Sequence, residues 1–120
     1  MRIAVSSKGT DLTSDVDPRF GRALNFLIFD TNDESIEVVE NTQNVHAMQG
    51  AGVQTAENIV NKKVDLVVAG NFGPKAFLAL DAAGVKVALY AEGTVSEAID
   101  LARNNKLKIC DKASVEGHWM

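Results

Sequence analysis

The chain has 120 residues, of which 46% are hydrophobic and 23% charged, with a formal net charge of -4. These values predict one globular domain and exclude a nucleic-acid binder that works through bulk positive charge. The single cysteine, Cys110, excludes an intrachain disulfide and a cysteine-rich metal site, and we expect a cytoplasmic protein without membrane spans.

Three short apolar segments among the first 40 residues predict β-strands. Residues 3–6 have the pattern of a buried strand, residues 25–30 are apolar on both faces, and residues 35–40 alternate as an edge strand does. The second and third segments form a hairpin. Polar loops are predicted at residues 7–24 and 41–50.

From residue 51 onward, predicted helices and strands alternate. Helices are expected at about 51–62, from Pro74 to Gly84, and after a capping box formed by Thr94 and Glu97. Strands are expected at 64–69 and 85–90, with a short final strand at 107–110. We assign residues 1–110 to a single domain and residues 111–120 to a C-terminal tail.

This order of elements predicts a mixed α/β fold. Strands separated by a helix are parallel with right-handed crossovers, whereas the first three strands are expected to form an antiparallel meander. Placing the first strand beside the fourth gives the spatial order 3-2-1-4-5, with helices against the sheet. The connections of these two neighbouring strands diverge, and open α/β sheets bind ligands at such a switch point.

Loops at one edge of this sheet carry features of an anion site. The loops are residues 7–24, 41–50, 69–73 and 91–94. Seven of the nine glycines lie in or beside them, and glycine lets backbone N–H groups approach a ligand closely. Helix N-termini, which attract anions, begin at the same edge. Cations also occur there: Lys8, Arg19, Arg22, His46 and Lys75. Alternatively, the glycines serve turns alone and the arginines pair with Asp15 and Asp17.

Three motifs, taken together in order and spacing, resemble one protein family. They are residues 17–23 (DPRFGRA), residues 50–56 (GAGVQTA), and residues 70–74 (GNFGP) followed by 83–87 (AGVKV). Through them the chain, from Met1 to about Leu107, resembles the dinitrogenase iron–molybdenum cofactor biosynthesis family, the NifX-like proteins. The resemblance implies a three-layer α/β/α, ribonuclease-H-like fold around the five-stranded sheet.

The resemblance also implies a function, which is noncovalent binding, carriage or storage of an iron–molybdenum cofactor or its precursor. A protein donor or acceptor of the cluster is then the expected partner. The family includes the orange protein of sulfate-reducing bacteria, which binds a mixed molybdenum–copper sulfide cluster and is similar to this chain in length and build. The resemblance therefore leaves the metals open. Such polyanions need cations, backbone N–H groups and apolar surface rather than thiolates.

The residues expected to bind this cofactor come from the three motifs and the loop before the second. Arg19, Arg22 and His46 would supply charge, and His46 is also a candidate metal ligand. Phe20 and Phe72 would supply apolar contact. Access would come from five glycines: Gly21, Gly50, Gly52, Gly70 and Gly73. Other interpretations stay open, because Phe20 is favoured as a core anchor of the long loop and a lone loop histidine is commonly solvated.

Two other classes of function are possible. Metal-dependent nucleases of the ribonuclease-H-like fold hold metals with acids on the central strands. Here the first strand has no acid, and Asp30 and Asp65 are expected at strand ends that do not meet. No Gly-x-Ser-x-Gly elbow accompanies Ser6 and Ser7. We therefore expect a protein without enzymatic activity. A cofactor-free regulatory or interaction module remains the alternative.

Overall fold

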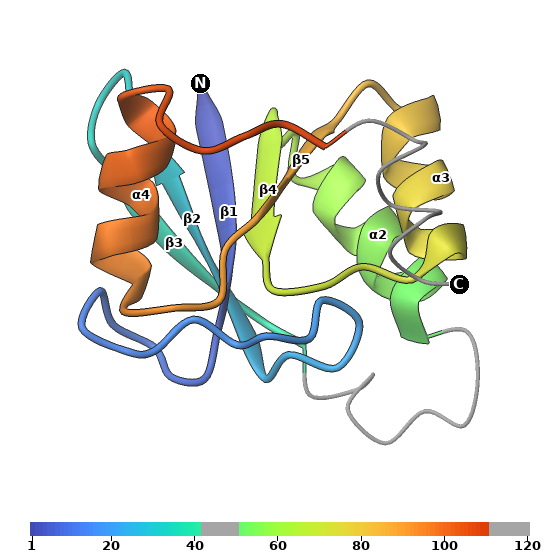
Figure 1. Cartoon of the computed structure of the whole chain (residues 1–120), viewed down its shortest axis with the longest axis horizontal. Helices are drawn as coiled ribbons and strands as arrows, with labels where there is room; N and C mark the ends of the chain where they lie inside the picture. The colour runs from blue at the N-terminus through green and yellow to red at the C-terminus, as the bar shows by residue number, and fades with distance from the viewer. Residues whose placement is uncertain (42–50, 111–120) are drawn as a thin grey trace.

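A computed structural model describes residues 1–41 and 51–110. Five strands form one mixed sheet in the order β3-β2-β1-β4-β5 (Figure 1). They are β1 (Arg2–Ser7), β2 (Asn25–Asp30), β3 (Ile36–Glu40), β4 (Leu66–Ala69) and β5 (Lys86–Leu89). β1 pairs antiparallel with β2 and parallel with β4, and β2 pairs antiparallel with β3. The predicted strand order and the predicted meander are therefore confirmed.

Helices cover both faces of this sheet. In the described ranges they are α2 (Ala51–Asn61), α3 (Pro74–Ala82) and α4 (Val95–Arg103). α2 and α3 pack together on one face and α4 packs on the other, which confirms the three-layer α/β/α arrangement (Figure 1). None of the helices within these ranges is long and apolar enough to cross a membrane.

Strand residues alternate between two hydrophobic cores, because successive side chains of a strand point to opposite faces. In β1, Ala4 belongs to the core under α2 and α3, whereas Ile3 and Val5 belong to the core under α4. In β2, Phe26 and Leu27 divide between the same two cores. Burial on both faces explains why these segments read as continuous apolar runs.

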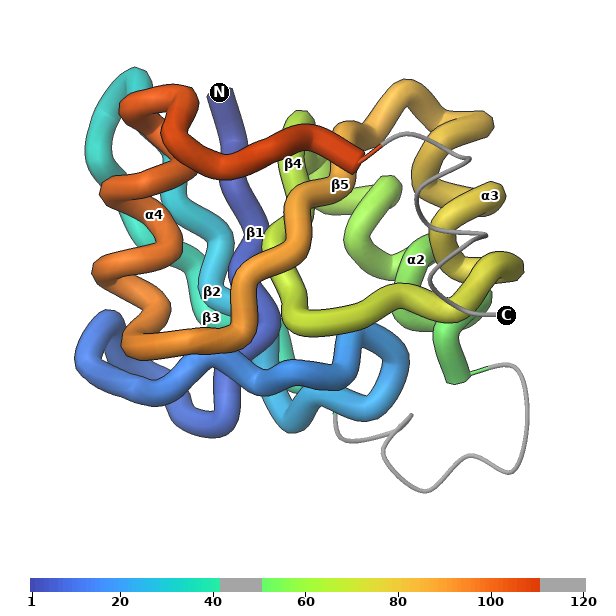
Figure 2. Tube along the Cα trace, in the orientation of Figure 1, coloured from blue at the N-terminus to red at the C-terminus, as the bar shows by residue number. Residues whose placement is uncertain are grey.

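The segment between β1 and β2 has no regular helix or strand, yet it is tied to the sheet. The Asp17 N–H donates to the Ser6 carbonyl at 2.9 Å, and the Ser6 hydroxyl donates to the Asp17 carbonyl at 2.6 Å. The Val16 N–H donates to the Gly93 carbonyl at 3.1 Å. Figure 2 shows this segment crossing one end of the sheet, from below α4 to below β4.

The predicted final strand at 107–110 is wrong. This segment makes one isolated bridge, between Ile109 and Ala88, and the Cys110 N–H donates to the Val87 carbonyl at 2.7 Å. Leu107 packs against the core under α4 and Cys110 against the core under α2 and α3, so the chain crosses the edge of β5 from one face of the sheet to the other.

Candidate functional site

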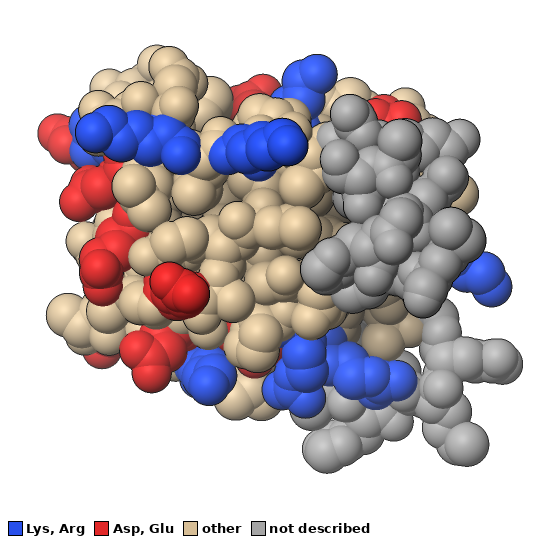
Figure 3. All heavy atoms as spheres, in the orientation of Figure 1, with Lys and Arg blue, Asp and Glu red and all other residues tan. Residues whose placement is uncertain are grey.

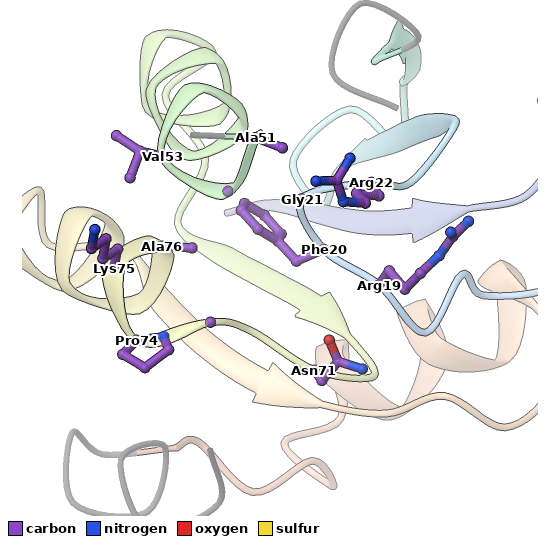
Figure 4. Close-up of a pocket in the computed structure, with 12 residues that line it drawn as sticks. Arg19, Phe20, Gly21, Arg22, Ala51, Val53, Asn71, Pro74, Lys75 and Ala76 are labelled. Atoms are coloured by element: carbon purple, nitrogen blue, oxygen red, sulfur yellow. The ribbon is translucent and has the colours of Figure 1, made fainter. Parts of the chain in front are cut away.

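A pocket of about 550 Å³ lies where residues 19–22 meet the first turns of α2 and α3 (Figure 4). It opens at the end of the sheet where β1 and β4 finish, which is the predicted switch point. Its volume falls within the range of roughly 300–1,000 Å³ typical of small-ligand sites. The described lining residues are Arg19, Phe20, Gly21, Arg22, Ala51, Gly52, Val53, Asn71, Gly73, Pro74, Lys75 and Ala76.

Two glycines let the three pocket walls approach one another closely. A Cβ atom on Gly21 would lie 2.9 Å from Cα of Gly52, so residues 19–22 pack directly against the backbone of α2. A Cβ atom on Gly52 would lie 3.2 Å from Cβ of Ala76, so α2 in turn packs closely on α3. Larger side chains at Gly21 and Gly52 would push these walls apart.

The pocket is positively charged in a chain whose net charge is negative. Arg19, Arg22 and Lys75 line it, and its described lining includes no aspartate or glutamate. Figure 3 shows lysine and arginine side chains at both the lower and the upper edge of this face, whereas acidic side chains lie mainly on the α4 side. A cleft lined by one sign of charge raises the local concentration of ligands of the opposite sign.

The start of α3 adds backbone donors to this charge. Gly73 is the N-cap residue and provides no side-chain cap, and Pro74 occupies the start of the helix. The first N–H groups of a helix have no partner within the helix and favour anions. A Cβ atom on Gly73 would meet no atom within 4 Å, so this wall borders open space.

Arg19 is held by a buried carboxylate. Asp17 is 1% exposed, and its Oδ1 accepts the Arg19 backbone N–H at 2.9 Å and the Arg19 Nε–H at 3.4 Å. The proposed pairing of an arginine with Asp17 is therefore confirmed for Arg19. In Figure 4 the Arg19 side chain extends away from the starts of both helices, so Arg19 charges the outer rim of the pocket.

Phe20 anchors the segment in the core, as favoured from the sequence. It is 1% exposed, and its ring centroid lies 4.8 Å from that of Phe72 and 5.4 Å from that of Phe26. Phe72 is fully buried behind Phe20, so Phe72 supports the wall instead of contacting a ligand. Gly70 does not line the pocket either, because it packs against Pro18 and Ala91.

The structure thus brings six of the ten predicted site residues into the lining of one pocket: Arg19, Phe20, Gly21, Arg22, Gly52 and Gly73. His46 and Gly50 lie outside the described residues. The predicted loop at 91–94 does not contribute to the described lining, because α4 packs on the opposite face of the sheet.

Sequence reasoning missed two kinds of site residue. Asn71 lines the pocket, and its carbonyl accepts the Phe20 N–H at 3.3 Å. Its position between the predicted residues Gly70 and Phe72 was the available signal. Thr55 and Asn41 are buried beneath the pocket and donate to the Gly21 carbonyl at 3.1 and 3.3 Å. For these two buried residues, the available signal was a threonine on the otherwise apolar face of the predicted helix.

Asp30, at the end of β2, and Asp65, just before β4, lie on either side of β1. Both come to Arg2, at the end of the sheet opposite the pocket. Asp65 Oδ2 accepts the Arg2 backbone N–H at 2.8 Å, and Asp30 Oδ2 lies 3.8 Å from Arg2 Nη1. The antiparallel direction of β2 places its C-terminal end beside the starts of β1 and β4. Arg2 thus contacts both carboxylates, Asp65 through its backbone N–H and Asp30 through its guanidinium.

The fold and the pocket define a small α/β protein with a cationic site at the switch point of a mixed sheet. The sequence profile described as dinitrogenase iron–molybdenum cofactor matches residues 1–105, and the chain belongs to this family.

Known proteins similar to this chain include both sequence and structural relatives. An uncharacterized protein of Methanocaldococcus jannaschii is 32% identical over 94 residues, covering 76% of this chain and 79% of that protein. The apo form of the orange protein from Desulfovibrio gigas superposes with a TM-score of 0.88 at 35% identity, covering 91% of this chain and 92% of that one. A protein of Thermotoga described as a putative NifB protein superposes with a TM-score of 0.80 at 44% identity, covering 90% and 91%.

Proposed function

We propose that this protein binds an anionic molybdenum-containing metal–sulfur cluster noncovalently in the pocket between residues 19–22 and the starts of α2 and α3. The cluster is cargo that the protein stores or carries between a protein donor and a protein acceptor, rather than a group that it uses in catalysis. An iron–molybdenum cofactor precursor and a molybdenum–copper sulfide cluster both have the required negative charge and sulfur surface.

The observation that carries this proposal is the composition of the pocket wall. Arg22 and Lys75 provide positive charge, and the first turn of α3 provides backbone N–H groups for an anion. Apolar surface comes from Val53 and Pro74, which suits a polarisable sulfide face better than a fully hydrated oxyanion. Family membership supports the same class of ligand.

The donor set also supports noncovalent binding. Within residues 1–41 and 51–110, no group of three His, Cys, Asp or Glu side chains is placed to hold a metal ion. Cys110 packs against the core beside β5 and does not line the pocket. Charge and hydrogen bonds to the sulfide ligands therefore account for binding at the described wall.

Elemental analysis and a visible absorption spectrum of natively and anaerobically purified protein test the proposal. We expect stoichiometric molybdenum with copper or iron, together with charge-transfer bands. Protein purified without metal is then treated with tetrathiomolybdate plus copper or iron. A colourless, metal-free protein that takes up neither combination contradicts the proposal and favours a cofactor-free interaction module.

A further inference from the structure

A buried polar pair lies directly beneath the pocket wall. Thr55, on α2, is 0% exposed, and Asn41, after β3, is 2% exposed. The Thr55 hydroxyl lies 3.1 Å from the Gly21 carbonyl oxygen and 3.2 Å from Asn41 Oδ1. Asn41 Nδ2 donates to the Gly21 carbonyl at 3.3 Å and to the Ala23 carbonyl at 2.9 Å. Two side chains thus converge on a single backbone oxygen of residues 19–22.

We propose that Thr55 is a positioning residue for the cluster site, acting with Asn41 through the carbonyl of Gly21. This inference rests on the proposed function and deepens it. Thr55 does not touch the cargo. It fixes the backbone between Phe20 and Arg22, which both line the pocket.

Peptide geometry explains how one carbonyl sets the wall. The peptide unit is planar, and its N–H points opposite to its carbonyl. Holding the Gly21 oxygen toward α2 therefore also sets the direction of the Arg22 N–H. A Cβ atom added to Gly21 would lie 2.9 Å from Cα of Gly52. With so little space, the peptide between Gly21 and Arg22 cannot rotate freely without disturbing α2.

Packing alone does not account for a threonine at this position. The other buried residues of α2 are Ala51, Ala56 and Ile59, all apolar. Valine has nearly the same shape as threonine and would fill the same space without a buried hydroxyl. A buried polar group is costly unless it is hydrogen-bonded, and here the one hydroxyl proton lies within reach of two acceptors, the Gly21 carbonyl and Asn41 Oδ1.

The test uses the full chain with three substitutions. Thr55→Val removes the hydroxyl and keeps the shape, whereas Thr55→Ser keeps the hydroxyl. Ile59→Val is the matched control, because it trims a buried side chain on the same helix away from Gly21. Each variant is measured for amide hydrogen exchange of residues 19–24 without cargo. The dissociation constant of tetrathiomolybdate in the presence of copper is measured at a temperature where all variants are folded.

We expect Thr55→Val to speed amide exchange in residues 19–24 several-fold and to raise the dissociation constant about tenfold. Thr55→Ser and Ile59→Val should stay within about twofold of the wild type. If Thr55→Val exchanges its amides and binds the cluster like the wild type, the inference is overturned. An equal loss of affinity in Ile59→Val also overturns it.

The two readouts separate this inference from the proposed function. If the wild type binds no cluster, the proposed function fails and the inference fails as a statement about cargo, although exchange still shows whether Thr55 orders the segment. If the wild type binds the cluster and Thr55→Val binds it equally well, the proposed function stands and the positioning role alone is overturned.

Discussion

Two glycines of the pocket, Gly21 and Gly73, have different structural roles. Gly21 is required by packing, since any Cβ atom there would press on the backbone of Gly52. Gly73 has φ of -69°, which any residue adopts, and an added Cβ atom would meet nothing within 4 Å. The glycine at 73 therefore leaves space at the pocket wall that the fold itself does not need.

This difference predicts opposite outcomes for the same substitution. Gly73→Ala should cost at most about 1 kcal/mol of stability, an N-cap effect, yet weaken cluster binding about tenfold or more by occupying the open space. Gly21→Ala should lower the free energy of unfolding by about 1–3 kcal/mol, because the backbone of residues 51–52 must move to make room for the added methyl group. Chemical denaturation and titration with tetrathiomolybdate plus copper measure both. Unchanged affinity in Gly73→Ala would place the cargo elsewhere.

The cationic residues Arg22 and Lys75 give a second prediction. Arg22→Gln and Lys75→Gln should each weaken cluster binding by about tenfold at low salt, because each removes a charge-assisted contact to an anion. Lys86→Gln is the control, since Lys86 is exposed at the opposite end of the sheet. Equal affinity in all three variants, or a loss independent of ionic strength, would argue against an electrostatic site.

At the scale of elements, helices α3 and α4 begin in contrasting ways at the same end of the sheet. α4 begins with a complete capping box, in which the Glu97 N–H donates to the Thr94 hydroxyl at 3.2 Å and the Thr94 N–H donates to Glu97 Oε1 at 3.1 Å. α3 begins at Gly73 with no side-chain cap. At the start of α3, beside the pocket, no side chain caps the first N–H groups. At the start of α4, on the far face of the sheet, Thr94 accepts the Glu97 N–H.

Removing the cap of α4 should therefore affect stability without affecting the site. Thr94→Ala should lower the free energy of unfolding by about 1 kcal/mol. Its affinity for tetrathiomolybdate plus copper should remain that of the wild type, because α4 packs on the other face of the sheet. Urea denaturation and the same titration provide the measurements, with Thr94→Ser as the variant that retains the cap. A loss of affinity in Thr94→Ala alone would show that α4 contributes to the site.

The two ends of the sheet differ in charge: the described pocket lining carries cations without acids, whereas acids and cations pair at the opposite end. At the end opposite the pocket, Glu37 lies 2.6 Å from Lys62 Nζ and 3.3 Å from Arg2 Nη2. The hydrogen bond from Lys62, with a further contribution from Arg2, lowers the pKa of Glu37 below its ordinary value of 4.5. A lowered pKa means that the pairing stabilises the folded chain above pH 4.5 and that this contribution disappears as the pH falls through the folded pKa.

Glu37→Gln should accordingly destabilise the protein at pH 7 by less than about 1 kcal/mol, as expected for a partly exposed ion pair. The difference from the wild type should vanish at a pH far enough below 4.5 that the wild-type carboxylate is protonated as well. Urea denaturation at both pH values checks this, with Glu57→Gln on α2 as a variant that removes the same charge elsewhere. A deficit that persists unchanged at acid pH would point to lost packing rather than lost charge.

The sequence by itself determined the strand order and the edge of the sheet that carries the candidate site, and its family resemblance implied the three layers. Period-2 burial, capping residues and right-handed crossovers are local or topological rules, so one chain reveals them. Only the tertiary structure decided which loops form the pocket, because α4 takes the loop at 91–94 to the other face. It also decided that Phe72 lies behind Phe20, that Asp30 and Asp65 both contact Arg2, and that Thr55 reaches Gly21. These contacts join residues far apart in the chain, and close packing between elements, rather than any local pattern, determines them.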